Sequence, residues 1–286
     1  MDEVSHYRIG DLGISLIGIH PKEYLEEGNF AAFATSEAGE YTYLVTKEAE
    51  IREPEGVPFF DSQSGWRQYQ KAEGWEIVVN ASRQKPFLAA RLSADFQSGS
   101  FQTTPNRLSP NLWHDPLGFP MGKILMMNLL GAGLGVLMHA CGISWQRKGL
   151  LFTGESEAGK STTARLWSTY PDARVLSDDL VILRKVNGEF RMFGTPWYSS
   201  AGTSSPESVT LEKVFLLKHG LKNKVSFVEP AHALPQLIKR AFAPLWSRPG
   251  MEFTSAFLAD LCQEIPVYAL DFRPERSAVE YVQCLT

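Results

Sequence analysis

A glycine-rich stretch followed by lysine and serine is the strongest chemical signal in this sequence. Residues 154–161 read GESEAGKS, which fits the pattern GxxxxGK[ST]. An apolar, β-prone run (149–153) precedes the stretch and a helix-compatible run (162–167) follows it, as the pattern requires. Glycines let backbone N–H groups converge on phosphate oxygens, and the start of the following helix adds partial positive charge. The stretch therefore predicts a phosphate-binding loop (P-loop).

The residues of this loop have separate expected tasks. Lys160 reaches the β- and γ-phosphates of a nucleoside triphosphate, and the Ser161 hydroxyl ligates Mg²⁺. Glu155 and Glu157 carry the wrong charge for an anion site, so we expect their side chains to point outward. The residues expected to contact the nucleotide are Gly154, Glu155, Ser156, Glu157, Ala158, Gly159, Lys160, Ser161 and Thr162.

Two neighbouring aspartates, Asp178 and Asp179, follow the apolar run 173–177. Two carboxylates can divide the work of holding Mg²⁺ and accepting the proton of an attacking hydroxyl. Adjacent residues of a strand point to opposite faces, so both reach one site only if the strand has already ended. The pair favours phosphoryl transfer, with a solvated β-turn as the alternative. The expected Mg²⁺ ligands are Ser161, Asp178 and Asp179.

Two other classes of protein fit the sequence poorly. Residues 223–226 read NKVS, which resembles the base-reading NKxD of GTPases but has serine in place of the guanine-binding aspartate. The 28 basic and 32 acidic side chains give a net charge of −4, which lacks the basic field of a nucleic-acid-binding protein. A GTPase and a nucleic-acid partner are therefore not expected.

Cysteine usage and the chain start indicate a cytoplasmic protein. The three cysteines are widely spaced and odd in number, which fits neither a disulfide framework nor a zinc site. Residues 1–6 lack the basic flank and apolar run of a signal peptide. Residues 124–143 carry no formal charge and are long enough to span a membrane, but Asn128 and three glycines indicate a helix end followed by a strand. We therefore expect no membrane association.

The elements that must position these residues divide the chain into two parts. Short β segments are expected before residue 105, at 41–46, 75–79 and within 87–104. Four prolines between 105 and 120 exclude regular structure, so we expect an exposed connector there. Helix and strand then alternate. Helices are expected at 119–131, 160–169, 231–244 and 251–263; strands are expected at 134–145, 149–153, 173–177, 213–217 and 267–271, with a hairpin at 181–193 that turns at Asn187-Gly188.

Taken together, these residues resemble the catalytic domain of HPr kinase/phosphorylase and its relatives, whose P-loop fold is shared with phosphoenolpyruvate carboxykinase. Members carry a His-Ala or His-Gly pair on a strand, then a strand, the loop, a helix and a strand that ends in Asp-Asp. This sequence has His139-Ala140, the loop and Asp178-Asp179 in that order, and the resemblance covers about residues 119–200. It implies an α/β P-loop kinase domain with a mixed β-sheet, which we expect over 111–286. The β segments and the prolines predict a smaller β-rich domain before it, over 1–110.

The resemblance also implies roles for single residues. Asp179 would be the catalytic base, Asp178 and His139 would be orienting or proton-linked partners, and Lys160 would contact the transferred phosphoryl group. ATP and Mg²⁺ are the implied cofactors. HPr kinases carry a Mg²⁺-binding glutamate where residues 193–198 here read FGTPWY. This departure argues against HPr itself as the acceptor and makes the element look like that of HPr-kinase-related kinases of unassigned substrate.

The leading hypothesis is ATP- and Mg²⁺-dependent transfer of the γ-phosphoryl group to a hydroxyl of a protein, a peptide or a small molecule. The alternative is a regulatory nucleotide-binding protein without turnover; the missing glutamate favours it, and the aspartate pair opposes it. A decarboxylating carboxykinase would need a His/Lys metal site and an arginine-lined dicarboxylate pocket, and we locate neither. The acceptor, the choice of ATP over GTP and the formation of a homo-oligomer stay open.

Two further features could serve such a kinase. Residues 199–205 are all small and could form a mobile loop over a substrate, or a passive linker. The candidates for neutralising charge in the transition state are Arg240, Arg248 and Arg273.

Overall fold

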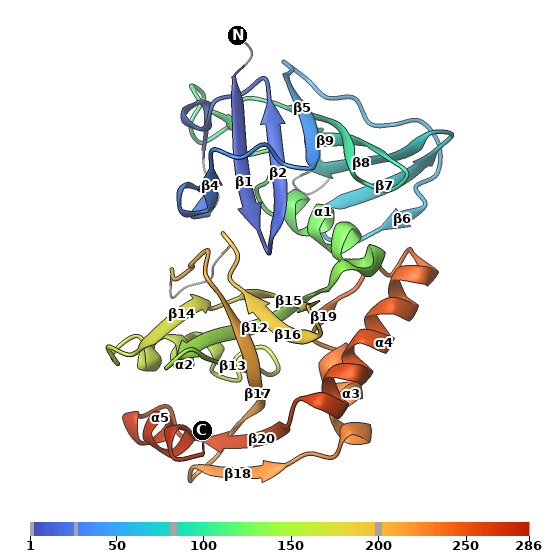
Figure 1. Cartoon of the computed structure of the whole chain (residues 1–286). Helices are drawn as coiled ribbons and strands as arrows, with labels where there is room; N and C mark the ends of the chain where they lie inside the picture. Colours follow the sequence, from blue (N-terminus) through green and yellow to red (C-terminus); the bar gives the residue numbers. More distant parts are fainter. Residues whose placement is uncertain (1–2, 26–27, 81–84, 198–201, 286) are drawn as a thin grey trace. The chain divides into compact units, whose positions relative to one another are not determined.

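The structure is a computed structural model that describes residues 3–25, 28–80, 85–197 and 202–285. It is a mixed α/β protein with two large mixed sheets and few helices (Figure 1). Contacts divide the chain into unit 1, Met1–Ala132 with Pro244–Arg248, and unit 2, Gly133–Ala243 with Pro249–Thr286. The division that we expected at residue 110 falls elsewhere in these contacts, because the helix α1 (Met121–Leu129) and the segment Pro244–Arg248 belong to unit 1.

Unit 1 is built on a β-sheet. Its strand order is β4 (Ala34–Thr35), β1 (Val4–Ile9), β2 (Leu12–Ile17), β5 (Tyr41–Lys47), β10 (Ser98–Thr103), β9 (Pro86–Ser93), β8 (Gly74–Asn80), β7 (Trp66–Lys71) and β6 (Phe60–Asp61). In β5 the side chains of Tyr41, Tyr43 and Val45 are buried and alternate with exposed ones, so one face of the strand packs into the core. Two short 3₁₀ turns, Pro21–Glu23 and Phe30–Phe33, complete this part of the unit.

The proline-rich segment 105–120 belongs to unit 1 and is exposed only in part, so it is not the exposed connector between domains that we expected. Its residues Trp113–His114 form β11, which pairs with β3 (Tyr24–Leu25). Asn106 Oδ1 accepts hydrogen bonds from the backbone N–H groups of Leu108 and Ser109 at 2.9 and 3.2 Å. Side-chain oxygens thus bond backbone groups that the prolines keep out of a regular ladder.

The uncharged stretch 124–143 ends one helix and begins a strand, as expected. α1 continues into a π-helical turn, Leu130–Leu134, and the strand β12 (Val136–Trp145) follows. Among the described residues, no helix combines the length and the apolar character needed to cross a membrane.

Unit 2 carries the second large sheet. Its main path is β13 (Lys148–Thr153), β12, β15 (Leu180–Val186), β16 (Glu189–Phe193), β17 (Ser208–His219), β20 (Val267–Phe272) and β18 (Lys224–Phe227). Two more strands, β14 (Ala173–Ser177) and β19 (Ala241–Phe242), pair with β12. β13 also pairs in parallel with β17, so the path from β13 to β17 closes on itself.

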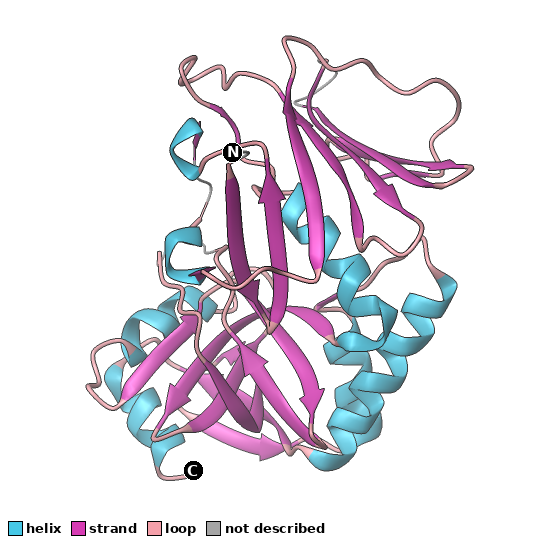
Figure 2. Cartoon of the chain, turned by 45° about the horizontal axis from the view of Figure 1, so that its top comes forward, coloured by secondary structure: helices cyan, strands magenta, loops and turns pink. Residues whose placement is uncertain are grey.

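Helices cover unit 2 on two sides (Figure 2). They are α2 (Lys160–Trp167), α3 (Pro230–Ile238), α4 (Arg248–Glu264), of which Arg248 belongs to unit 1, and α5 (Arg276–Gln283). One core holds Ala164 and Trp167 of α2 together with Val279 of α5, and a separate core holds residues of α3 and α4. The side chain of Trp167 is 1% exposed and lies at the end of α2, so the helix that follows the glycine-rich loop is anchored in the core.

Candidate functional site

The register of β12 brings the two halves of the site together. Ala140 lies opposite Thr153, the last residue before the loop, and His139 lies opposite Leu180, the first residue after the aspartates. Hydrogen bonds also connect these residues across the strands. The Thr153 hydroxyl donates to the His139 carbonyl at 2.8 Å, and Ala140 N donates to the Asp179 carbonyl at 2.9 Å. One strand therefore holds the loop on one edge and the aspartates on the other.

The loop connects β13 to α2 and holds the amine of Lys160. This side chain donates hydrogen bonds to the carbonyls of Gly154 at 3.3 Å and Glu155 at 3.0 Å. Lys160 is 7% exposed, whereas Glu155 and Glu157 are exposed. Burial lowers the pKa of the Lys160 amine, the nearby Asp179 carboxylate opposes this shift, and the Arg240 guanidinium adds to it. The positive charges of Lys160 and Arg240 therefore lie within electrostatic reach of each other beside the loop.

The aspartates sit in a turn between β14 and β15. The Ser177 hydroxyl accepts hydrogen bonds from the backbone N–H groups of Asp179 at 3.3 Å and Leu180 at 3.2 Å. Because β14 ends at Ser177, the two adjacent carboxylates are not held on opposite faces of a strand. Asp178 is 1% exposed, and both aspartates line the same cavity as Lys160.

His139 is hydrogen-bonded to Asp179. Its Nδ1 lies 3.1 Å from Asp179 Oδ1 and 3.2 Å from the Asp179 carbonyl oxygen. Both partners are acceptors when the carboxylate is ionised, so Nδ1 carries the proton and donates to them. This arrangement fixes the orientation of the imidazole relative to the Asp179 carboxylate.

The loop and the aspartates line an open cavity of about 380 Å³. Its lining residues are His139, Ser156, Glu157, Gly159, Lys160, Ser161, Thr162, Arg165, Asp178 and Asp179. The three remaining loop residues of our expected set, Gly154, Glu155 and Ala158, line adjoining cavities.

The donors in this cavity suit a magnesium ion that arrives with a nucleotide. Among the residues that the structure describes, no group of three or more His, Cys, Asp or Glu could hold a metal ion by itself. Mg²⁺ prefers one or two carboxylates and completes its shell with phosphate oxygens and water. The Ser161 hydroxyl and the carboxylates of Asp178 and Asp179 share the cavity and provide such a set.

The sequence did not predict that the element 194–197 supports the aspartate turn. The Thr195 hydroxyl donates to the Leu180 carbonyl at 2.7 Å, and both Thr195 and Trp197 are buried. A Cβ at Gly194 would lie 1.9 Å from the carbonyl oxygen of Ser205, so only glycine fits there. The element 194–197 thus packs beneath the turn and supplies no metal ligand. Residues 198–201, which include Tyr198 and part of the small-residue tract 199–205, lie outside the described residues.

Of the three candidate arginines, only Arg240 lines the cavities beside the loop. The side chain of Arg273 is 56% exposed and forms an ion pair with Glu275 at 3.7 Å. Arg248 belongs to unit 1. No pattern in the sequence distinguished Arg240 from the other two arginines. Arg240 lies beside the loop because α3, which precedes it in the chain, packs there.

Gly159 tests how closely the loop is fitted to its surroundings. Its φ is +103°, and an added Cβ would lie 2.4 Å from Phe272 Cζ. We expect Gly159→Ala to lower the free energy of unfolding by about 1–3 kcal/mol from backbone strain alone, and by more from the clash with Phe272. Urea denaturation measures this change.

Gly133→Ala is the matched control for this change. Gly133 has a φ of +106° and no atom within 4 Å of an added Cβ, so it reports the backbone cost alone. Equal losses of stability in the two variants would show that the clash between the added methyl group and Phe272 does not lower the free energy of unfolding.

The fold and the site define a class: a mixed α/β protein with a glycine-rich loop between a strand and a helix, facing an aspartate pair. No family model matches the chain, and no curated protein matches it. Among solved structures, it is similar to the HPr(Ser) kinase/phosphatase from Coxiella burnetii, with 12% identity over 52% of this chain and 91% of that chain and a TM-score of 0.28. At this TM-score the likeness is a distant structural relation, and no residue role rests on it.

Proposed function

We propose that this protein is an ATP- and Mg²⁺-dependent kinase that transfers the γ-phosphoryl group to a hydroxyl. The observation that carries the proposal is the shared cavity. The Lys160 amine, the Ser161 hydroxyl and the carboxylates of Asp178 and Asp179 line one space of about 380 Å³ at the start of α2. A phosphate-binding loop alone would support only nucleotide binding, and the facing carboxylates add the groups that transfer requires.

The proposal gives each residue a chemical task. The backbone amides of the loop and the start of α2 bind the phosphates, and Lys160 contacts the β- and γ-phosphate oxygens. Asp179 accepts the proton of the acceptor hydroxyl while the hydroxyl oxygen attacks the γ-phosphorus. The bond between the γ-phosphorus and the oxygen that leaves with ADP breaks. His139 orients Asp179 through the 3.1 Å hydrogen bond to Oδ1. When bound, Mg²⁺ neutralises charge on the phosphates, and Ser161 with Asp178 would hold it.

Burial distinguishes the roles of the two aspartates. Asp178 is 1% exposed, whereas the side chain of Asp179 is 32% exposed and forms the hydrogen bond with His139. A base must reach an incoming substrate, so Asp179 suits that task and Asp178 suits metal binding. ATP labelled at the γ-phosphate tests the proposal: the wild-type protein with Mg²⁺ should release or transfer the label, slowly where water replaces the acceptor.

The second candidate is a regulatory nucleotide-binding protein without turnover. The element 194–197, which holds no carboxylate in this sequence, favours it. A protein that binds Mg-ATP yet transfers label neither to water, nor to itself, nor to products of neighbouring genes would support this candidate. A protein that binds no Mg-ATP would contradict both.

A further inference from the structure

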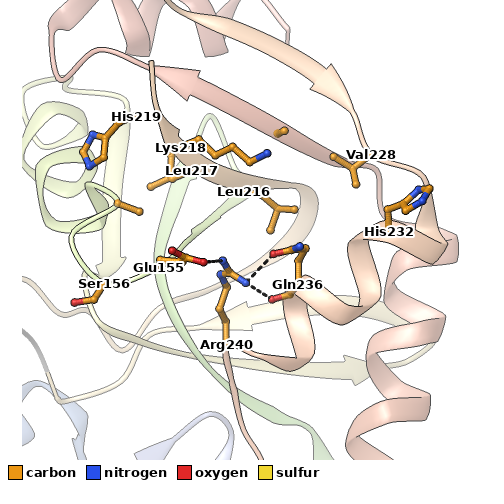
Figure 3. Close-up of a pocket in the computed structure, with 12 residues that line it drawn as sticks. Glu155, Ser156, Leu216, Leu217, Lys218, His219, Val228, His232, Gln236 and Arg240 are labelled. Carbon is orange, nitrogen blue, oxygen red and sulfur yellow. Dashed lines mark hydrogen bonds and ion pairs between the residues drawn. The ribbon is translucent and has the colours of Figure 1, made fainter. Parts of the chain in front are cut away.

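We infer that the cavity beside the loop, lined by Arg240, binds the acceptor, and that this acceptor carries an anionic group close to the hydroxyl that is phosphorylated. The inference rests on the proposed kinase function and names the chemical class of its second substrate. The cavity has a volume of about 570 Å³ and lies between the loop, the end of β17 and α3 (Figure 3).

Arg240 is a buried cation with unused hydrogen-bonding capacity. Its side chain is only 10% exposed, and Figure 3 shows it reaching into the cavity. The terminal nitrogen Nη1 donates to the Gln236 carbonyl at 2.6 Å and to Gln236 Oε1 at 3.2 Å. Nη2 lies 4.0 Å from Glu155 Oε1, and Nε has no hydrogen-bond acceptor within the described parts of the chain. A buried guanidinium with an unsatisfied donor favours an anionic ligand, since carboxylates and phosphates match its geometry.

The surroundings of Arg240 combine a few titratable side chains with an apolar floor. The titratable lining residues are Glu155, Lys218, His219, His232 and Arg240. The apolar part of the lining consists of Ala158, Leu216, Leu217, Val228 and Ala269. Such a mixture of apolar walls and a few convergent polar groups is typical of a site for an organic molecule.

A second, smaller cavity shares lining residues with this one and with the cavity that Asp179 lines. It has a volume of about 290 Å³, and its lining includes both His139 and Arg240. The backbone also connects these residues, because His139 N donates to the Arg240 carbonyl at 2.8 Å. A molecule whose anionic group lies on Arg240 can therefore direct a hydroxyl toward His139 and Asp179.

A nucleoside base is the competing occupant of the large cavity. A base is uncharged at neutral pH, so it would leave the Arg240 charge with only the Gln236 oxygens and the Glu155 carboxylate at 4.0 Å as partners among the described residues. Glu155 and Lys218 offset each other in charge, so the excess positive charge of the lining is that of Arg240. The acceptor is therefore the better match in charge.

Three small probes of one carbon skeleton test the inference: glycerol, D-glycerate and glycerol 3-phosphate. They are titrated by calorimetry into protein saturated with the non-hydrolysable Mg-AMP-PNP, so that the phosphate loop is already filled. We expect at least one of the two anions to bind at least about tenfold more tightly than neutral glycerol, as a charge-assisted hydrogen bond allows. If D-glycerate binds more tightly, the acceptor carries a carboxylate; if glycerol 3-phosphate binds more tightly, the acceptor carries a phosphate.

Arg240→Gln should abolish the preference for anions while leaving Mg-AMP-PNP affinity within about threefold of the wild type. The matched control is Arg276→Gln, because Arg276 is an exposed arginine on α5 whose partners are Tyr170 and Glu280. This control should keep the preference, and unfolding by heat should confirm that both variants are folded.

Each other outcome overturns the inference. Glycerol that binds as tightly as both anions, or a preference that survives in Arg240→Gln, removes the anionic acceptor. A large loss of Mg-AMP-PNP affinity in Arg240→Gln assigns the cavity to the nucleotide instead. A wild-type protein that binds no Mg-AMP-PNP overturns the proposed function as well, and the nucleotide titration, performed first, separates that failure from the others.

Discussion

Replacing Lys160 with alanine is expected to lower the affinity for Mg-ATP by about 100-fold or more. The Lys160 amine is buried, and its hydrogen-bond partners in the loop are two backbone carbonyls. A phosphate offers the same amine charge-assisted hydrogen bonds, each about twice as strong as a neutral one. The bound nucleotide should therefore depend strongly on this side chain. Calorimetric titration of Mg-ATP into both proteins measures the difference.

Lys185→Ala is the matched control for this prediction. Lys185 lies on β15, forms an ion pair with Glu264 and does not line the cavity. Its variant should bind Mg-ATP as the wild type does. An unchanged affinity in a folded Lys160→Ala protein would remove the assignment of residues 154–161 as a phosphate loop.

Replacing Asp179 with asparagine is expected to slow phosphoryl transfer by roughly 10²–10⁴-fold, the usual effect of removing a positioned base. Asparagine keeps the size of the side chain, so the contact with His139 and the turn after β14 should persist. Nucleotide affinity should therefore change little. Single-turnover assays with ATP labelled at the γ-phosphate measure the rate, and calorimetry measures the affinity.

Asp178→Asn separates the two aspartates. If Asp178 holds Mg²⁺, its variant should need a higher Mg²⁺ concentration for half-maximal activity, whereas Asp179→Asn should not. The matched control is Asp172→Asn, because Asp172 is exposed and precedes β14. Rates that are equal in Asp179→Asn and wild type would exclude Asp179 as the base.

Local signals in the sequence predicted most elements of unit 2. The Asn187-Gly188 turn appears with φ values of 52° and 84°, which the hairpin between β15 and β16 requires. α5 was not expected, because a short amphipathic helix near the chain end differs little from a loop in sequence. The proline-rich segment was misjudged for a different reason. There the side chains of Asn106 and Asp115 accept backbone hydrogen bonds in place of regular ladders.

The sequence predicted the types of the chemical groups in the site but not all of their positions. The phosphate loop and the aspartate pair could be predicted from the sequence, because each is a motif of consecutive residues. The pairing of His139 opposite Leu180 depends on the register of β12, which no single segment encodes. Thr195 and Arg240 reach the site through tertiary packing, so their sequence neighbours give no sign of it. The roles of all these residues remain predictions.

The most direct test of the central claim compares Mg-ATP with AMP in the same calorimetric experiment. If residues 154–162 and the facing aspartates bind the β- and γ-phosphates with Mg²⁺, most of the affinity comes from groups that AMP lacks. We predict that Mg-ATP binds at least about 100-fold more tightly than AMP, and that chelating Mg²⁺ weakens ATP binding. Equal affinities for ATP and AMP, or no binding of ATP, would contradict the account.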